Sequence, residues 1–147
     1  MGNIQYKDII VKAKGYRVPG KPPTFFCVEV SGFKVNVDKV NGEAPSPLDY
    51  QLVSLAGCFN VVCNVVAREM GIDVEDFEVE VEGVFNPEKL STGKGLRAGY
   101  KEIRVKVRVK SKAPREVLEK LIKTVEERCP IADNLVNPTP LVVTLEA

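Results

Sequence analysis

The sequence predicts an α+β protein, and three features of its pattern carry that prediction. Segments on both sides of the central apolar stretch alternate apolar and polar residues, which is typical of half-buried antiparallel strands. The apolar stretch Leu52–Ala67 lies in the middle and is too long for an ordinary strand. A later segment repeats apolar residues at helical spacing. With 147 residues, 44% of them hydrophobic, we expect a single domain over residues 1–147.

The N-terminal part predicts three strands. The first covers Ile4–Lys12. The next two, Thr24–Val30 and Phe33–Val37, flank Ser31-Gly32, a pair suited to a tight hairpin turn. The Gly/Pro-rich stretch Gly15–Pro23 is expected to be a loop.

A central helix is expected after residue 45. Ser46 can cap it, Pro47 needs no N–H partner at the first helical position, and Asp49 completes a capping box. We expect the helix to run to Met70 and to stop at Gly71. Its apolar stretch is too short and too mixed for a membrane span, so the pattern predicts a helix buried all round, in part by a second subunit.

Two longer strands follow the central helix. Phe77–Phe85 and Tyr100–Val109 alternate apolar and charged residues, which predicts an antiparallel pair with one face in water. The intervening Gly-rich stretch Ser91–Gly99 is expected to be a loop.

The C-terminal part predicts a second helix that begins at Pro114 and buries one apolar stripe. The stripe consists of Val117, Leu118, Leu121, Ile122 and Val125. Cys129 follows one turn later, and Pro130 disfavours helical geometry there while suiting the first position of a short helix, Ile131–Leu135. Cys129 is therefore expected near an N-cap, where the helix dipole favours a thiolate. Leu141–Leu145 predicts a closing strand.

Composition excludes several classes of function. Lysine and arginine number 21 and aspartate and glutamate 20, so bulk charge predicts no nucleic-acid partner and no membrane-surface partner. The start of the chain, Met1–Tyr6, lacks the pattern of a secretion signal, and we expect a cytoplasmic protein. Four cysteines in that reducing compartment point to redox chemistry, metal binding or packing rather than to structural disulfides. The absence of histidine excludes acid, base or ligand chemistry by that residue.

Two of the four cysteines lie in distinctive settings. Cys58 follows Ala56-Gly57 inside the apolar helix, and Cys129 precedes Pro130 between two helical stretches. A thiolate is a good nucleophile, and a second thiol within reach converts its oxidation into a reversible disulfide. Packing in the core is the alternative for each residue alone. A four-cysteine zinc site is disfavoured because the spacing contains no C-x₂-C pair. Cys27 and Cys63 are expected to be core residues.

The capped helix that leads into Leu55-Ala56-Gly57-Cys58, taken with Cys129-Pro130 and the order of the other elements, resembles the OsmC/Ohr family of osmotically inducible and organic-hydroperoxide-resistance proteins. The resemblance implies antiparallel sheets around a central cysteine helix and an intertwined homodimer with its active sites at the subunit interface. It also implies a stress-response peroxidase that reduces organic hydroperoxides with thiols and without a metal or haem cofactor.

Carried over to this chain, the resemblance implies a peroxidatic role for Cys58, which becomes a sulfenic acid, and a resolving role for Cys129, which closes a Cys58–Cys129 disulfide. A thiol or dithiol reductant, a lipoyl group in some members, then reopens it. Arg17 is the nearest match to the family's thiolate-stabilising arginine.

One position departs from the family pattern. Leu48 stands ten residues before Cys58, where peroxidase members carry a glutamate, and Asp49 is the adjacent carboxylate. Asp49 projects about 100° around the helix from Leu48, which also suits it to the cap. This departure favours an alternative: a non-catalytic binding or redox-sensing protein that holds an apolar ligand in a dimer cleft.

Overall fold

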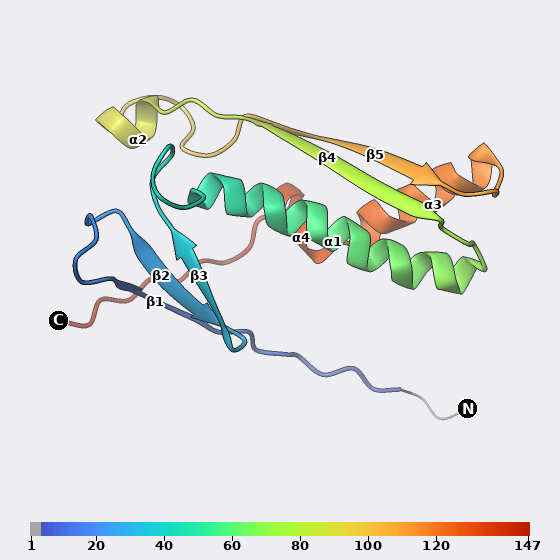
Figure 1. Cartoon of the computed structure of the whole chain (residues 1–147), viewed down its shortest axis with the longest axis horizontal. Coiled ribbons are helices and arrows are strands. Elements are labelled where there is room, and N and C mark those ends of the chain that lie inside the picture. Colours follow the sequence, from blue (N-terminus) through green and yellow to red (C-terminus); the bar gives the residue numbers. More distant parts are fainter. Residues whose placement is uncertain (1–3) are drawn as a thin grey trace. The chain divides into compact units, whose positions relative to one another are not determined.

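The computed structural model describes residues 4–147 and divides into two compact units, Met1–Tyr50 and Gln51–Ala147. Figure 1 labels the elements of both. The residues 1–3 that contribute to the localisation prediction lie outside the described chain. Helices and antiparallel strands together confirm the α+β class.

The first unit contains a three-stranded antiparallel sheet in the order β1-β2-β3 (Figure 1). Its strands are β1 (Ala13–Arg17), β2 (Phe26–Val30) and β3 (Phe33–Val37). Ser31 and Gly32 connect β2 to β3 with φ angles of 50° and 82°. Two consecutive positive φ angles are typical of the type I′ turn that favours a right-twisted hairpin. The predicted hairpin is therefore confirmed.

The first strand was predicted in the wrong place. It lies at Ala13–Arg17, partly inside the predicted loop, whereas Ile4–Lys12 forms no strand and leaves its apolar side chains exposed. Gly15, which the sequence places in a loop, pairs with Val28, and a β-carbon at Gly15 would collide with the ring of Phe26. A glycine inside a strand permits this close approach.

Helix α1 (Pro47–Met70) has the predicted ends. The Asp49 N–H donates to Ser46 Oγ at 3.2 Å, and the Ser46 N–H donates to Asp49 Oδ2 at 2.8 Å. This reciprocal pair is a capping box, which satisfies backbone donors that the first helical turn leaves free. At the other end Gly71 has a φ of 68°, the left-handed conformation that commonly terminates a helix.

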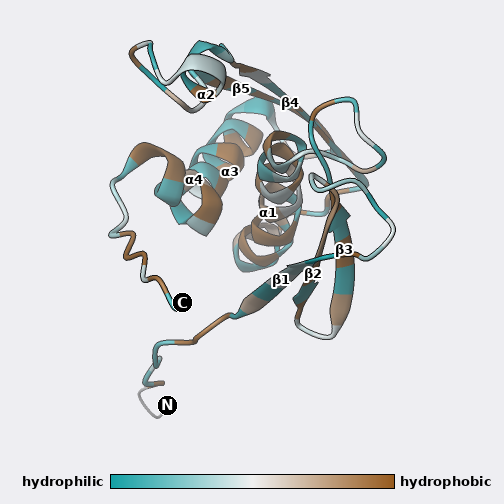
Figure 2. Cartoon of the chain, turned by 90° about the vertical axis from the view of Figure 1, so that its left-hand side faces the viewer, coloured by the Kyte–Doolittle hydropathy of each residue, from teal (hydrophilic) through white to brown (hydrophobic). Residues whose placement is uncertain are grey.

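The second unit packs its apolar core between α1, a strand pair and two further helices (Figures 1 and 2). Strands β4 (Asp76–Val84) and β5 (Glu102–Lys110) are antiparallel, and α3 (Arg115–Arg128) precedes α4 (Pro130–Val136). In α3 the predicted stripe is inward, with Leu121 and Val125 fully buried. The buried cluster contains Leu55, Phe59, Cys63, Val66, Ala67, Leu121, Val125 and Cys129.

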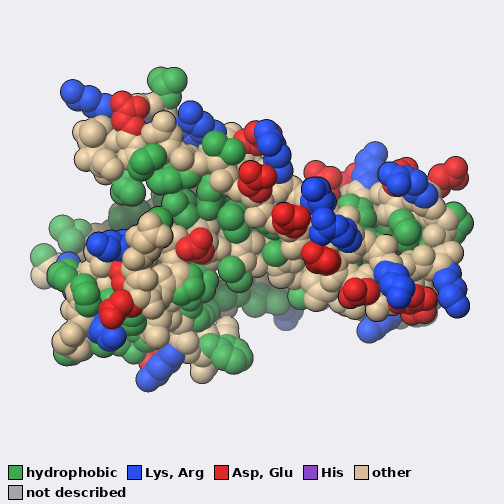
Figure 3. Space-filling model, turned by 45° about the horizontal axis from the view of Figure 1, so that its top comes forward, with side chains coloured by type: hydrophobic (Ala, Val, Ile, Leu, Met, Phe, Trp, Pro, Cys, Tyr) green, Lys and Arg blue, Asp and Glu red, His purple; other side chains and the backbone are tan. Residues whose placement is uncertain are grey.

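The outer face of the β4–β5 pair is charged, as predicted. Side chains alternate between partly buried and exposed along both strands. Figure 3 shows acidic and basic groups interspersed over this face. Arg108 bridges two positions of β4, with Nη1 at 2.9 Å from Glu78 Oε1 and Nη2 at 3.7 Å from Glu80 Oε2. Exposed ion pairs contribute little stability, so the sheet is held mainly by its inner face.

Helix α1 is not buried all round. One face packs into the core, but Val53, Val61 and Val65 retain 60%, 63% and 45% of their accessible surface. Among the described residues α1 is the one helix long and apolar enough to cross a membrane, a test that core helices of soluble proteins also pass. The single chain therefore buries only part of α1, and burial of the remaining surface by a second subunit stays a prediction.

Two further predictions differ from the structure. Leu141–Leu145 is exposed and forms no strand, because no other described strand hydrogen-bonds to it. A short helix, α2 (Glu88–Thr92), occupies the beginning of the expected 91–99 loop region. The Asn86 side chain accepts the Glu88 N–H at 2.9 Å in the turn that precedes the helix, and Gly93 ends the helix in the left-handed conformation.

We expect Ser46→Ala to lower the free energy of unfolding by about 1 kcal/mol, because the α1 cap loses its hydroxyl acceptor. Urea denaturation followed by circular dichroism measures the change. Ser54→Ala is the matched control, since Ser54 is exposed within the same helix and its hydroxyl only donates to the Gln51 carbonyl. An equal effect of both substitutions would argue against the cap.

Candidate active site

The structure brings Cys58 and Cys129 into direct contact across 71 residues of sequence. Helix α1 supplies Cys58, and the junction of α3 and α4 supplies Cys129. The two sulfur atoms lie 2.7 Å apart, and neither cysteine is in a disulfide. A disulfide has an S–S distance of about 2.0 Å, so the pair can bond with a shift of less than an ångström.

The position of Cys129 follows from the proline after it. Cys129 has an extended conformation, with φ −73° and ψ 114°, and Pro130 is the first residue of α4. This break between the helices turns Cys129 into the N-cap of α4, where its Sγ accepts the Ala132 N–H at 3.4 Å. The side chain is fully buried, beside Leu121 and Val125 in the core cluster. The predicted N-cap is confirmed.

Cys58 is partly exposed, and its surroundings favour the neutral thiol. Burial raises the pKa of Cys58 above its ordinary value, and the adjacent Cys129 thiol raises it further. The backbone N–H of Ile131, in the first turn of α4, acts in the opposite direction. A nucleophilic thiolate at neutral pH therefore needs an additional positive charge near Cys58.

The hydrogen bonds of Asp49 belong to the helix cap. Its carboxylate accepts both the N–H and the hydroxyl of Ser46, and these hydrogen bonds hold the pKa of Asp49 below its usual value. Asp49 also lies nine residues before Cys58 on one helix, which is about 180° around the axis. The geometry supports a cap, and a catalytic role for Asp49 stays a prediction.

Arg17 is the last residue of β1, opposite Phe26, with an exposed side chain. It belongs to the first unit and Cys58 to the second, so its approach to the thiol stays a prediction.

The other two cysteines are buried, as predicted. Cys27 lies on β2 opposite Tyr16, and Cys63 lies in the core of the second unit. Burial raises the pKa of Cys63, which makes its thiol a poor nucleophile. Within residues 4–147 no group of three or more potential metal-ligating side chains comes together.

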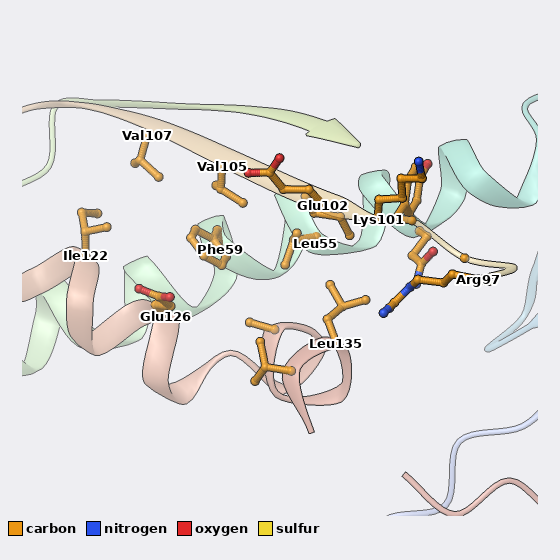
Figure 4. Close-up of a pocket in the computed structure, with 16 residues that line it drawn as sticks. Leu55, Phe59, Arg97, Lys101, Glu102, Val105, Val107, Ile122, Glu126 and Leu135 are labelled. Atoms are coloured by element: carbon orange, nitrogen blue, oxygen red, sulfur yellow. The ribbon is translucent and has the colours of Figure 1, made fainter. Parts of the chain in front are cut away.

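A pocket of about 500 Å³ lies in the second unit (Figure 4) and adjoins the thiol pair through Ala132. Neither sulfur lines it, but Ala132, which donates its N–H to Cys129, does. Its apolar walls come from four elements and include Leu55, Phe59, Val105, Val107, Ile122 and Leu135. The sequence marks these residues as core, and only their three-dimensional packing reveals the space between them.

Charged side chains lie at the ends of this pocket. Figure 4 shows Arg97 and Lys101 near one end and Glu126 toward the other. Glu102 also lines the pocket, and a hydrogen bond with the Arg104 guanidinium lowers its pKa. An elongated molecule with an apolar body and an anionic end would match the walls and the basic end.

Solved structures with the same fold include several OsmC-like proteins. An OsmC-like protein from Mycoplasma pneumoniae is 18% identical, with a TM-score of 0.77 over 90% of this chain and 91% of that one. An organic hydroperoxide resistance protein OsmC from Legionella pneumophila is 18% identical, with a TM-score of 0.65 over 86% and 89%. The organic hydroperoxide resistance protein OhrB of Bacillus subtilis is 16% identical, with a TM-score of 0.57 over 88% and 93%. At such identities the likeness establishes the fold.

No curated protein sequence matches the chain. A family model described as OsmC-like protein matches residues 40–144. The match contains Asp49, Cys58 and Cys129, whereas Arg17 lies outside it. It spans more than half of the 147 residues, and the chain therefore belongs to the OsmC-like protein family.

Proposed function

We propose that this protein is a thiol-dependent peroxidase that reduces organic hydroperoxides to alcohols through Cys58 and Cys129. The observation that carries the proposal is the 2.7 Å contact between the two sulfur atoms. The family includes organic hydroperoxide resistance proteins, which supports a role in peroxide resistance.

The reactants of the proposed cycle are these two thiols, the hydroperoxide and a reductant. The Cys58 thiolate attacks the terminal oxygen of the hydroperoxide, the O–O bond breaks, and the alkoxide leaves as an alcohol after taking a proton. Cys58 is then a sulfenic acid, which the Cys129 thiol attacks to form the disulfide and release water. A thiol or dithiol reductant, a lipoyl group among the candidates, returns both cysteines to thiols.

Arg17 is the proposed source of the positive charge that this chemistry requires. The surroundings of Cys58 within the second unit raise its pKa. A guanidinium within about 4–6 Å would favour the thiolate and lower that pKa. Because Arg17 ends a strand, its position is fixed by the β1–β2 pairing rather than by a loop.

A homodimer is the proposed working form. Val53, Gly57, Val61 and Val65 recur every four residues, so they form one exposed and largely apolar stripe on α1. The exposed segment Leu141–Leu145 adds four more apolar residues, Leu141, Val142, Val143 and Leu145. Extensive exposed apolar surface is typical of a protein interface.

A second candidate function is the binding of an apolar ligand without catalysis. The pocket beside the thiol pair supports it, because its volume and its apolar walls suit a small amphipathic molecule. The raised pKa of Cys58 also fits a slow redox sensor rather than a fast peroxidase.

One equivalent of cumene hydroperoxide added to the reduced protein is expected to remove two thiols and to create a Cys58–Cys129 disulfide. Intact mass and peptide mapping measure both changes. In Cys58→Ser no disulfide is expected, whereas Cys63→Ser, which changes a thiol outside the pair, should react as the unaltered protein does. Unreacted thiols, together with a small molecule that copurifies with the protein, would favour the binding function instead.

Arg17→Gln is expected to slow the reaction with hydroperoxide at pH 7 at least tenfold, because loss of the cation raises the pKa of Cys58 by about one unit or more. Since only the thiolate reacts, the midpoint of the rate against pH moves to higher pH. Arg17→Lys should recover part of the rate, and Lys14→Gln, on the same strand, should not change it. A pH profile that is identical in Arg17→Gln and the unaltered protein would remove Arg17 from the mechanism.

Val61→Glu is expected to convert a dimer into a monomer, because it places a charge in the centre of the α1 stripe. Light scattering coupled to size-exclusion chromatography should give twice the mass of one chain for the unaltered protein. Val40→Glu changes a valine of similar exposure outside the stripe, and this variant should remain dimeric. A monomeric unaltered protein would contradict the homodimer.

A further inference from the structure

The two cysteines of the pair differ in solvent exposure. Cys129 has no exposed surface, whereas Cys58 is partly exposed. The oxidised pair should keep this difference, because the sulfurs are already 2.7 Å apart and bonding needs only a small approach.

We propose that a reducing thiol enters the site only through Cys58, so that Cys58 carries the mixed disulfide and Cys129 leaves as the thiolate. This inference rests on the proposed function and concerns the half of its cycle that regenerates the enzyme. It assigns a different reductive role to each cysteine.

Access decides which sulfur is attacked. Thiol–disulfide exchange proceeds through attack of a thiolate on one sulfur, and its rate depends on how that sulfur can be reached. An approach to Cys129 would have to pass through the core side chains packed around it, including Leu121 and Val125, which are fully buried. Interiors of this density do not admit a thiol without local unfolding. The partly exposed Cys58 imposes no such requirement.

The leaving thiolate, Cys129, has a hydrogen-bond donor next to its sulfur. When the reductant thiolate bonds to Cys58 Sγ, the Cys58–Cys129 bond breaks and its electron pair stays on Cys129 Sγ. That sulfur already accepts the Ala132 N–H at 3.4 Å, and hydrogen bonding to a thiolate stabilises it. Cys129 then takes a proton. A second thiol attacks the sulfur of the reductant in the mixed disulfide, releases the Cys58 thiolate and leaves as part of an oxidised disulfide product.

The proposed order makes Cys129 a thiol that never binds the reductant. It can, however, attack the mixed disulfide from its fixed position and close the original bond again, since the two protein sulfurs stay adjacent. Variants that lack one cysteine of the pair avoid this reversal, and they provide the cleaner test.

The experiment compares Cys129→Ser with Cys58→Ser, each incubated in native form with glutathione disulfide at pH 8. No hydroperoxide is present. Mass spectrometry after acid quenching and peptide mapping measures the glutathione adduct at residue 58 or residue 129. We expect the adduct at Cys58 to form at least 20-fold faster than the adduct at Cys129. Equal labelling of both variants in denaturant, and matching circular dichroism spectra, show that any difference arises from the fold.

A rate at Cys129 within threefold of that at Cys58 would overturn the inference. In a second measurement, the diamide-oxidised protein is treated with 2-mercaptoethanol, quenched in acid and alkylated under denaturing conditions. Mercaptoethanol on Cys58 with alkylated Cys129 supports the inference, and the reverse pattern contradicts it. Because diamide replaces the hydroperoxide, a protein without peroxidase activity still gives a result, so failure of the inference and failure of the proposed function are distinguishable.

Discussion

The break between α3 and α4 at Cys129-Pro130 is the constraint on which the candidate site depends. A proline has no N–H and disfavours helical geometry in the residue before it, so α3 stops and α4 begins within one residue. Cys129 is thereby held in an extended conformation at an N-cap, with its sulfur against Cys58. A continuous helix would carry residue 129 onward along α3 and would leave Cys58 without a partner.

The same packing that brings the sulfurs together opposes their reactivity. A core position fixes Cys129 precisely, but the burial of the pair raises the pKa of Cys58. The first turn of α4 offsets part of this through the Ile131 N–H. A peroxidase built on this arrangement must obtain the rest of its thiolate stabilisation from a cation, whereas a binding protein or a slow sensor would not need one. The core positions the two thiols, and a nearby cation would decide whether Cys58 is reactive.

Local patterns predicted those features whose causes are local. The Ser46–Asp49 cap, the Gly71 stop, the Ser31-Gly32 turn and the Cys129 N-cap each follow from a few adjacent residues, and all are confirmed. The strand position of Gly15 does not follow from local pattern. A glycine is needed there because a β-carbon would collide with the ring of Phe26 on the neighbouring strand, eleven positions away in sequence. The pocket near the thiols also depends on contacts between distant segments, because residues with the sequence pattern of a core can enclose a cavity as well as fill one.

Three further disagreements have one feature in common. Ile4–Lys12, Leu141–Leu145 and the valine stripe of α1 all have the apolar pattern of buried elements, yet each is exposed in the single chain. The pattern of apolar and polar residues reflects burial in the assembled protein. In an oligomer, that burial includes contacts with other copies of the chain. Such surface is unfavourable in water unless it is covered. The proposed homodimer accounts for all three segments together, whereas a monomer would need a separate reason for each.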